Sequence, residues 1–489
     1  MRALGLLAIA LCAATSLAAQ APVAPISDAE LLARREALVA RLPNDAVLLV
    51  FGERDEIGFP AFFQNPNFRY LTGLDEPNEV LLLARGDGSA DAAGTLFRQE
   101  RTPSQRMFNG VLEDAAALTK RTGLAVRPLR QLAAVVDSII AAGKPLYLVS
   151  DTRPYGLVAD TLTRGSTFAV ALRRRTPAVV VNSADTAILT LRARKSAAEQ
   201  ALMRRSAAIT SASVTEAIRA IMPNEHEYDL QARIEAGFRT RGGDAHPGFA
   251  TNVSAGVNST AAHHRAGDAR LASGALVLMD VGSSVHGYAA DLTRTVPVSG
   301  TFSPAQREIY QLVRDAQAAA ERAAVVGAPI SITDDSAFAV IARGLARLGL
   351  VESADATFDP PWAERCGRDP RACKQSSFFL FHGVSHGVGL DVHDPLQSTY
   401  AAPGQRTIRP GDVFTIEPGL YLNAKYLAFL ADTPKNRAFV AKARAALGRY
   451  DGIGVRIEDD YLATSAGVER ITSTPHDIPD IERLMRRAR

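Results

Sequence analysis

The stretch that most constrains the fold is residues 275–296, ALVLMDVGSSVHGYAADLTRTV, in which two apolar runs each deliver one aspartate. The first run is too apolar for a surface loop, so it predicts a buried strand that carries Asp280. Gly282-Ser283-Ser284 predicts a turn, and Tyr288 to Val296 predicts the returning strand. The two strands would bring Asp280 and Asp291 together on one face of a sheet.

Two carboxylates buried together need compensation. An unpaired buried carboxylate loses solvation or takes up a proton, and two of them repel each other. A pair of metal ions is one solution, and structural ion pairs, for example with Arg294, are the other. This stretch alone leaves both open.

Charge and composition exclude some partners. The chain has 489 residues, 47% of them hydrophobic and 22% charged, which is ordinary for a globular protein of two or three domains. The net charge of +3 is small, and acidic and basic residues are mixed along the chain. We therefore expect no nucleic-acid partner.

The N-terminus predicts export. Arg2 precedes an apolar run that ends near Leu17, and small residues follow it, which is typical of a signal peptide over residues 1–21. The run is shorter than the roughly 20 residues that span a bilayer, although an uncleaved anchor is the alternative. We expect a periplasmic or secreted protein with no membrane attachment after cleavage. In that compartment Cys366 and Cys373 would form a disulfide, the alternative being two free thiols.

The first half of the chain predicts a compact α/β domain over residues 28–182, because short strand-like runs alternate with helical patterns. It contains no cluster of histidine, cysteine or acidic residues suited to chemistry. The runs are a helix at Asp28–Leu42, strands at Ala46–Phe51, Glu79–Ala84, Thr95–Phe97 and Leu146–Val149, and helices at Ala115–Arg121 and Leu129–Ala142.

The second half, residues 193–489, predicts a larger domain. Helices are expected after the capping box Ser196–Glu199, from Tyr228, and after Ser303-Pro304. Strand-like segments alternate with these helices, which predicts an antiparallel or mixed sheet with helices on one face. The polar stretches 352–377 and 422–451 are expected to be surface insertions.

Three of the nine histidines fall within residues 378–394, FFLFHGVSHGVGLDVHD. They are His382, His386 and His393, and glycines between them allow close backbone approach. An isolated histidine is more often a core or surface residue, but this clustering favours a functional site.

Two further carboxylates, Glu417 and Glu458, end strand-like runs. Each alone suits an edge-strand charge or an arginine partner. Four carboxylates and one imidazole together suit two hard or borderline divalent ions, and the absence of thiolate argues against structural zinc. The set is Asp280, Asp291, His386, Glu417 and Glu458.

The motifs that carry this set resemble those of the pita-bread metallopeptidases, which include methionine aminopeptidase, aminopeptidase P and prolidase. The resemblance runs from about Lys195 to the C-terminus through GYAADLTRT, HGVSHGVGLDVHD, TIEPGLY and GVRIEDD. Phe62 to Leu83 also resembles the creatinase-like N-terminal domain of bacterial aminopeptidase P. The resemblance implies an α+β protein, with a pita-bread catalytic domain and a smaller creatinase-like α/β N-terminal domain.

The resemblance also implies roles for the metal-site residues. Asp280 would chelate one ion, and Asp291 and Glu458 would bridge both. His386 and Glu417 would complete the other ion, Mn²⁺ being expected and Zn²⁺ or Co²⁺ the alternatives. A hydroxide bridging the ions would attack the peptide.

Further residues match positions near the reacting bond. Glu417 would also take the proton of the attacking water, and His393 would polarise the scissile carbonyl. His263, with His264 as the alternative, would contact the nitrogen after that bond. The expected substrate-cleft residues are His382, Tyr421 and Arg456.

The implied activity is that of an Xaa-Pro aminopeptidase, because His382 and the two-domain chain favour this branch over methionine aminopeptidase. Its substrates would be peptides with proline at the second position. Prolidase and a non-catalytic peptide-binding protein are the alternatives. A homo-oligomer, dimer or tetramer, is also implied.

The chain departs from the family at one place. Where relatives often carry a tryptophan that reaches a neighbouring subunit's cleft, Arg106, Met107 and Phe108 stand instead. Trp362, the single tryptophan, either replaces it or packs locally. The departure puts a pocket completed by a neighbouring subunit in doubt.

Overall fold

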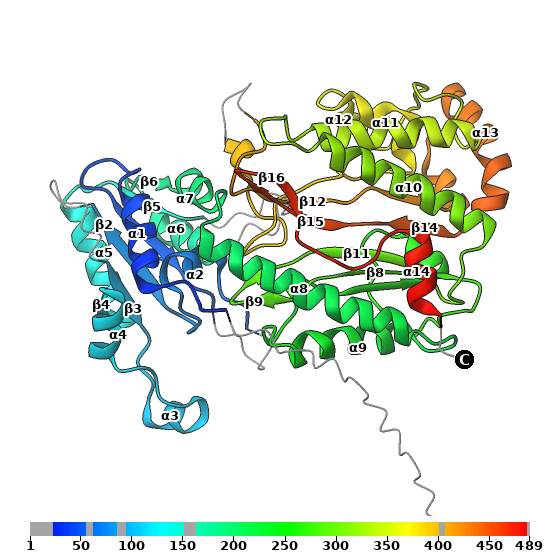
Figure 1. Ribbon diagram of the computed structural model, residues 1–489. Coiled ribbons are helices and arrows are strands. Elements are labelled where there is room, and N and C mark those ends of the chain that lie inside the picture. Colours follow the sequence, from blue (N-terminus) through cyan, green and yellow to red (C-terminus); the bar gives the residue numbers. More distant parts are fainter. Residues whose placement is uncertain (1–22, 55–61, 86–93, 151–162, 401–405, 487–489) are drawn as a thin grey trace, which may run out of the picture.

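The computed structural model describes residues 23–54, 62–85, 94–150, 163–400 and 406–486, which form two domains lying side by side (Figure 1). The predicted signal peptide, residues 1–21, lies outside the described residues. Among the helices of the described ranges, none combines the length and the hydropathy that a bilayer crossing requires.

The N-terminal domain is a mixed six-stranded sheet in the order β4-β3-β2-β1-β5-β6. Leu48 and Val50 pack on one face, and Val47, Leu49 and Phe51 pack on the other, so helices cover both faces. The strands are β1 Val47–Phe51, β2 Val80–Ala84, β3 Thr95–Arg98, β4 Ala125–Pro128, β5 Leu146–Leu148 and β6 Val181–Ser183.

Four helices pack on one face of this sheet and two on the other. The first group is α1 Asp28–Val39, α2 Pro66–Thr72, α4 Ala115–Thr122 and α7 Asp185–Arg192. The second is α5 Leu132–Ala141 and α6 Arg164–Arg175. Ile188 of α7 is part of the core, so the domain extends past residue 182. Helix α3, Pro103–Asn109, extends away from the sheet (Figure 1).

The C-terminal domain is built on antiparallel pairs, as the alternation of strands and helices predicted. Its strand orders are β11-β8-β7, β12-β15-β16 and β13-β14, with the short pair β10-β9. The strands are β7 Asn252–Ala255, β8 Leu276–Val281, β9 Ser284–Val285, β10 Tyr288–Ala289, β11 Leu292–Pro297, β12 Val413–Ile416, β13 Gly419–Leu422, β14 Ile453–Arg456, β15 Asp459–Thr464 and β16 Gly467–Arg470.

Helices flank these strands in two groups (Figure 1). One group is α8 Ala197–Ala220, α9 Glu227–Thr240 and α14 Ile478–Met485, and the other is α10 Pro304–Ala323, α11 Ile332–Arg347, the short α12 Ala363–Cys366 and α13 Pro434–Tyr450. The predicted capping boxes at Ser196 and Ser303 are both formed. A single apolar core joins the strands to the helices.

Two expectations were wrong. Residues 422–451 are not a surface insertion, because α13 buries Phe439, Ala443 and Leu447 against the core. The hairpin turn lies at His286-Gly287 and not at residues 282–284. Both turn residues have positive φ, 50° and 82°, which suits a two-residue hairpin loop.

The segment before the histidine cluster is closed by a disulfide between Cys366 and Cys373. Trp362 packs edge-on against Phe358, and its indole nitrogen donates a hydrogen bond to the carbonyl of Ala372 at 3.1 Å. The tryptophan therefore packs locally.

Candidate metal centre

The predicted carboxylate ligands lie in or just beyond strands. Asp280 is in β8, opposite Thr293 of β11, and Asp291 directly precedes β11. Glu417 directly follows β12, and Glu458 lies between β14 and β15. The backbone N–H of Glu458 donates to the carbonyl of Thr293 at 3.1 Å, which joins the two halves of the site.

His386 is placed by the neighbouring strand. The N–H of Thr415 donates to the His386 carbonyl at 2.9 Å. The imidazole Nε2 then lies 3.2 Å from Glu417 Oε1, 3.6 Å from Asp291 Oδ2 and 3.9 Å from Glu458 Oε1. Residues from four separate segments therefore converge on one point.

The donor set fits divalent cations. One ligand atom each from Asp291, His386 and Glu458 lies within 4.8 Å of the others. Asp291 Oδ1 and Glu458 Oε1 are buried and have no hydrogen-bond partner within the described protein. Unpaired buried carboxylate oxygens are unfavourable, and carboxylates with one imidazole suit Mn²⁺, Co²⁺ or Zn²⁺.

Asp280 lies beside this group and forms an ion pair with Arg456. Its negative charge raises the pKa of Glu458, after the larger effect of burial and that of Glu417. Arg294 was suggested as an ion-pair partner of the two aspartates, and this was wrong. It pairs instead with Asp459 at 2.7 Å.

The pKa values of the carboxylates in the site shift in opposite directions. Burial, followed by the charge of Glu458, raises the pKa of Asp291 well above its usual range. Burial also acts to raise the pKa of Glu417, but the hydrogen bond and charge of His386 outweigh it and lower that pKa to about 2. Glu417 is therefore ionised at neutral pH.

A polar chain connects Arg456, Tyr421 and His382, the residues expected in the substrate cleft. Arg456 Nη1 donates to the Tyr421 hydroxyl at 2.7 Å, and that hydroxyl lies 2.8 Å from His382 Nε2. His382 Nδ1 lies 2.6 Å from the Gly383 carbonyl, which requires a proton on Nδ1 and leaves Nε2 to accept from Tyr421. The three side chains thus form one chain of hydrogen bonds in which each donor and acceptor is fixed.

His393 packs against His386, the predicted metal ligand. Its ring meets that of His386 edge-on, with centroids 4.3 Å apart. Burial, followed by the charge of His386, lowers the pKa of His393 to about 4, so its imidazole is neutral at pH 7.

The two adjacent histidines, His263 and His264, have different neighbours. His263 is among the groups that lower the pKa of both His382 and His393, so it lies near both rings. His264 Nε2 instead lies 2.9 Å from Glu227 Oε2.

Glu227 was missed in the sequence. It is fully buried at the start of α9, and it accepts hydrogen bonds from the backbone of Ala255 and Gly267 and from the side chain of Asn258, at 2.7 to 3.0 Å. It thereby holds the loop that carries His263. The only signal was an acidic residue in the first turn of a helix.

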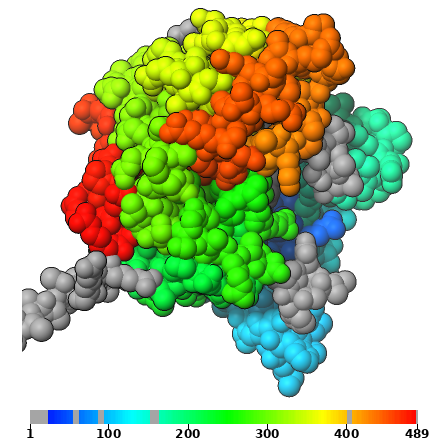
Figure 2. Space-filling model, turned by 90° about the vertical axis from the view of Figure 1, so that its right-hand side faces the viewer, coloured from blue at the N-terminus to red at the C-terminus, as the bar shows by residue number. Residues whose placement is uncertain are grey.

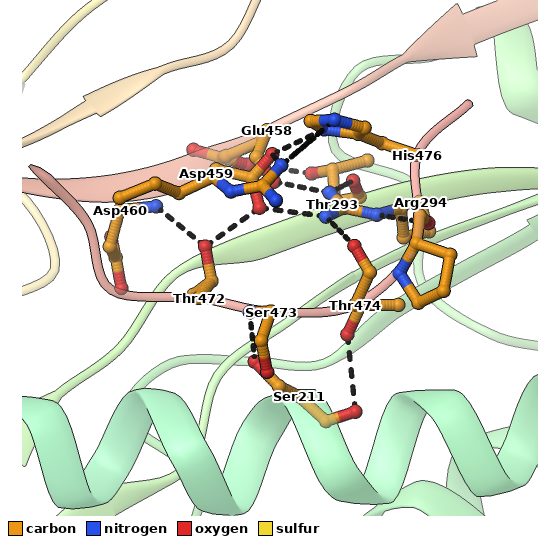
Figure 3. A network of polar contacts seen from close by, with 12 residues as sticks. Ser211, Thr293, Arg294, Glu458, Asp459, Asp460, Thr472, Ser473, Thr474 and His476 are labelled. Carbon is orange, nitrogen blue, oxygen red and sulfur yellow. Dashed lines mark hydrogen bonds and ion pairs between the residues drawn. The ribbon is translucent and has the colours of Figure 1, made fainter.

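A second layer of buried groups supports Glu458 (Figure 3). Arg294 is fully buried and donates five hydrogen bonds, including one to the Glu458 carbonyl at 2.6 Å and one to Asp459 at 2.7 Å. Asp459 also accepts from Thr472 at 2.7 Å and lies 3.2 Å from His476.

Asp460 completes this layer by accepting the backbone N–H of Asp291 at 2.9 Å. Of the three acidic residues at 458–460, only Glu458 was predicted to have a role. The other two were missed because only metal ligands were expected there.

Comparison with known proteins gives two family matches. Residues 201–465 match the model described as metallopeptidase family M24, and residues 32–147 match the aminopeptidase P N-terminal domain. An Xaa-Pro aminopeptidase of Haemophilus influenzae is 32% identical over 470 residues, covering 92% of this chain and 96% of that protein.

Solved structures agree with these matches. Proline aminopeptidase P II from Yersinia pestis superposes with a TM-score of 0.76 at 28% identity, covering 94% of this chain and 99% of that one. Aminopeptidase P from E. coli with the inhibitor Pro-Leu gives a TM-score of 0.75 at 26% identity, with the same coverage of both chains.

Proposed function

The chain belongs to metallopeptidase family M24, and from this membership we infer that it is a metal-dependent aminopeptidase that hydrolyses the bond between an N-terminal residue and a following proline. The observation that carries the chemistry is the convergence of Asp291, His386 and Glu458, whose ligand atoms lie within 4.8 Å of one another. The observation that carries the substrate is the nearly full-length similarity to Xaa-Pro aminopeptidases.

Two divalent ions, which we propose to be Mn²⁺, would be held by Asp280, Asp291, His386, Glu417 and Glu458. When bound, they supply Lewis acidity and lower the pKa of water, which makes a nucleophile available at neutral pH. The hard oxygen donors support manganese, while the single imidazole also accepts Zn²⁺ or Co²⁺.

The chain's own groups would orient the substrate and move protons. Glu417 is ionised at neutral pH, so its carboxylate can take a proton from the attacking water and return it to the proline nitrogen. His393 is neutral, so a ring N–H can donate to the scissile carbonyl oxygen without adding positive charge beside the metal ligands.

The proline of the substrate makes other hydrogen bonds between enzyme and peptide more important. An Xaa-Pro bond has no amide hydrogen, so the enzyme cannot use that N–H to position it. His263, which lies near His382, would together with it hold the peptide on the proline side instead. Arg456 and Tyr421 would line the cleft and fix the tautomer of His382.

A two-substrate assay tests the function. Mature protein loaded with Mn²⁺ should release the first residue of an Xaa-Pro-Yaa tripeptide, and chelation should stop the reaction. Activity restricted to Xaa-Pro dipeptides would instead identify a prolidase. Absence of metal-dependent turnover on both substrates would leave only peptide binding.

Variants test the metal ligands. Asp280→Ala and Glu458→Ala should abolish turnover and lower the metal content measured by elemental analysis. Glu469→Ala is a matched control, because this carboxylate lies on β16 at the surface, where it pairs with Arg204. Full activity in either ligand variant would refute the site.

We also propose export and self-association. The signal-like residues 1–21 and the Cys366–Cys373 disulfide support an oxidising, periplasmic or secreted location. Met107 and Phe108 are 87% and 85% exposed on α3, which projects below the body of the molecule in Figure 2. Exposed apolar side chains on a projection support contact with a second copy, as a dimer or tetramer. Cleavage-site mapping and light scattering test these two proposals.

A further inference from the structure

Three charged side chains are buried together where the two domains meet. Lys195 Nζ lies 2.6 Å from Asp394 Oδ2, and Arg192 pairs with the other oxygen of the same carboxylate. Their side chains are between 1% and 2% exposed. Buried charges persist only when they are matched, so these contacts hold each partner in one place.

Asp394 directly follows His393 and closes the loop that carries it. Its backbone N–H donates to the Gly387 carbonyl at 2.8 Å. Gly387 and Gly389 allow this closure, because an added Cβ would lie 2.2 Å from the Asp394 carbonyl oxygen at the first position and 2.3 Å from its carboxylate at the second. The loop therefore packs around the Asp394 anchor.

The anchor is also tied to the N-terminal domain. Arg192 ends α7, which lies on the side of that domain facing the catalytic domain (Figure 1). Its Nη1 donates to the side chain of Asn67, in α2, at 2.7 Å. Leu390, in the middle of the histidine loop, packs against the apolar cores of both domains.

We propose that Asp394 is a positioning residue for His393, and that Arg192 and Lys195 transmit the docking of the N-terminal domain to it. This inference rests on the proposed function, in which His393 donates to the scissile carbonyl. The loop from Gly387 to Asp394 contains no helix, and its two ends pair with each other, so the ion pairs of Asp394 help to fix where His393 lies relative to His386. A displacement of about 1 Å in a catalytic group can lower a rate by roughly 100-fold.

Two aspartates in the same loop provide a matched pair. Asp391 also pairs with Arg192, at 2.8 Å, but its side chain is 36% exposed and Lys195 does not hold it. Asp394→Asn should lower kcat by about 10- to 100-fold with little change in KM, while Asp391→Asn should change kcat by less than about twofold. Elemental analysis should find both metal ions retained in each variant.

Two variants of Lys195 separate the effect of its charge from the effect of its packing. Lys195→Met should behave like Asp394→Asn, and Lys195→Arg should restore most of kcat because it keeps a cationic donor. Thermal melts identify any variant that fails to fold. Hydrogen exchange of residues 387–396 provides a readout independent of activity: these amides should lose protection in Asp394→Asn and keep it in Asp391→Asn.

A double-mutant cycle tests the route through His393. If Asp394 acts through that ring, Asp394→Asn should add little to the loss caused by His393→Ala. An equally large loss in both backgrounds would overturn the positioning role. Asn67→Ala should lower kcat by about three- to tenfold, and an unchanged kcat would overturn the part played by the N-terminal domain.

The outcomes distinguish this inference from the proposed function. A wild-type protein that cleaves neither substrate with metal would refute the function, while the exchange experiment would still report on the anchor. An active wild type with normal exchange and normal kcat in Asp394→Asn would refute the anchor alone.

Discussion

Asp291 and Glu458 are two carboxylates that the fold brings together with both side chains buried. Each keeps one oxygen without a hydrogen-bond partner in the described protein, and burial and neighbouring negative charges raise the pKa of both. Divalent cations reverse this repulsion, so metal binding and folding stability are linked at these two residues.

The first prediction concerns metal-stripped protein. The raised pKa values mean that the folded state binds more protons than the unfolded chain between about pH 4 and the raised values, so stability should fall as pH rises through this window. Between about pH 5 and pH 8 the Tm of stripped wild type should fall by about 3 °C or more relative to Glu458→Gln.

The difference in Tm between wild type and Glu458→Gln isolates the effect of the Glu458 carboxylate. His382 and His393, whose pKa values are lowered, act in the opposite direction, but they are present in both and cancel in the difference. Calorimetry after chelation and dialysis measures it. Parallel pH profiles for wild type and Glu458→Gln would contradict the prediction.

The second prediction separates two neighbouring histidines. His263→Ala should lower kcat/KM by about 10-fold or more with unchanged stability, because His263 lies near His382 and His393 and is expected to contact the substrate. His264→Ala should lower the free energy of unfolding by about 1 to 2 kcal/mol, because it removes one of four donors to the buried Glu227. Steady-state kinetics and urea melts on both variants would show the reverse pattern if the assignment is in the wrong register.

At this scale the sequence identified the histidines and carboxylates whose spacing and flanking runs were unusual. It did not identify Glu227, Asp459 or Asp460, because each becomes special only through burial beside groups that are distant in the chain. Such partners have no local pattern from which to predict them.

At the scale of elements, the site depends on how strands end. Asp291, Glu417 and Glu458 each lie one residue outside a paired strand, so their side chains project where the ladders stop. Arg294 joins β11 to the Glu458 carbonyl and to the segment after β16 (Figure 3). This arginine holds the strand ends in register.

The third prediction tests that joint. Arg294→Lys replaces five donors by at most three and leaves buried carbonyls unpaired, so it should lower the free energy of unfolding by about 3 kcal/mol or more and weaken metal binding. Arg470→Lys is the control, because Arg470 lies 3.7 Å from the same Asp459 but is one-third exposed. Equal effects in the two variants would exclude a special role for Arg294.

The sequence predicted elements best where periodicity and capping residues agreed, as for α8 and α10. It missed α13, although Phe439, Ala443 and Leu447 recur at helical spacing, because the many charged residues between them made the stretch resemble a loop. It misplaced the hairpin turn because the run Gly-Ser-Ser resembles a turn more than His-Gly does, while the pairing of β9 with β10 decides the position.

At the scale of the whole molecule, buried ion pairs connect the two domains. Arg34 of α1 lies 3.3 Å from Glu199 of α8, and Tyr288 donates to the same carboxylate at 2.9 Å. The ion pair between Arg34 and Glu199 joins the two domains and is buried on both sides, so it would be costly to break.

The fourth prediction follows from this junction. The melt of wild type should be the same by far-ultraviolet circular dichroism, which reports on both domains, and by fluorescence of Trp362, which reports on the catalytic domain. Arg34→Met should separate the two curves, with a loss of about 3 kcal/mol. Arg121→Met, which removes exposed ion pairs to Asp28 and Glu113, should cost less than about 1 kcal/mol and keep the curves together. Separate curves in wild type would contradict the shared junction.

The placement of Asp291, Glu417 and Glu458 just beyond their strands also bears on how this architecture can evolve. Their side chains can be exchanged without removing a ladder hydrogen bond, so drift at these positions leaves the scaffold folded. A gene duplicate can therefore lose its metal ligands, keep the scaffold that held them, and acquire a new reaction there. The same separation of scaffold and reactive groups makes the three positions natural targets for directed evolution.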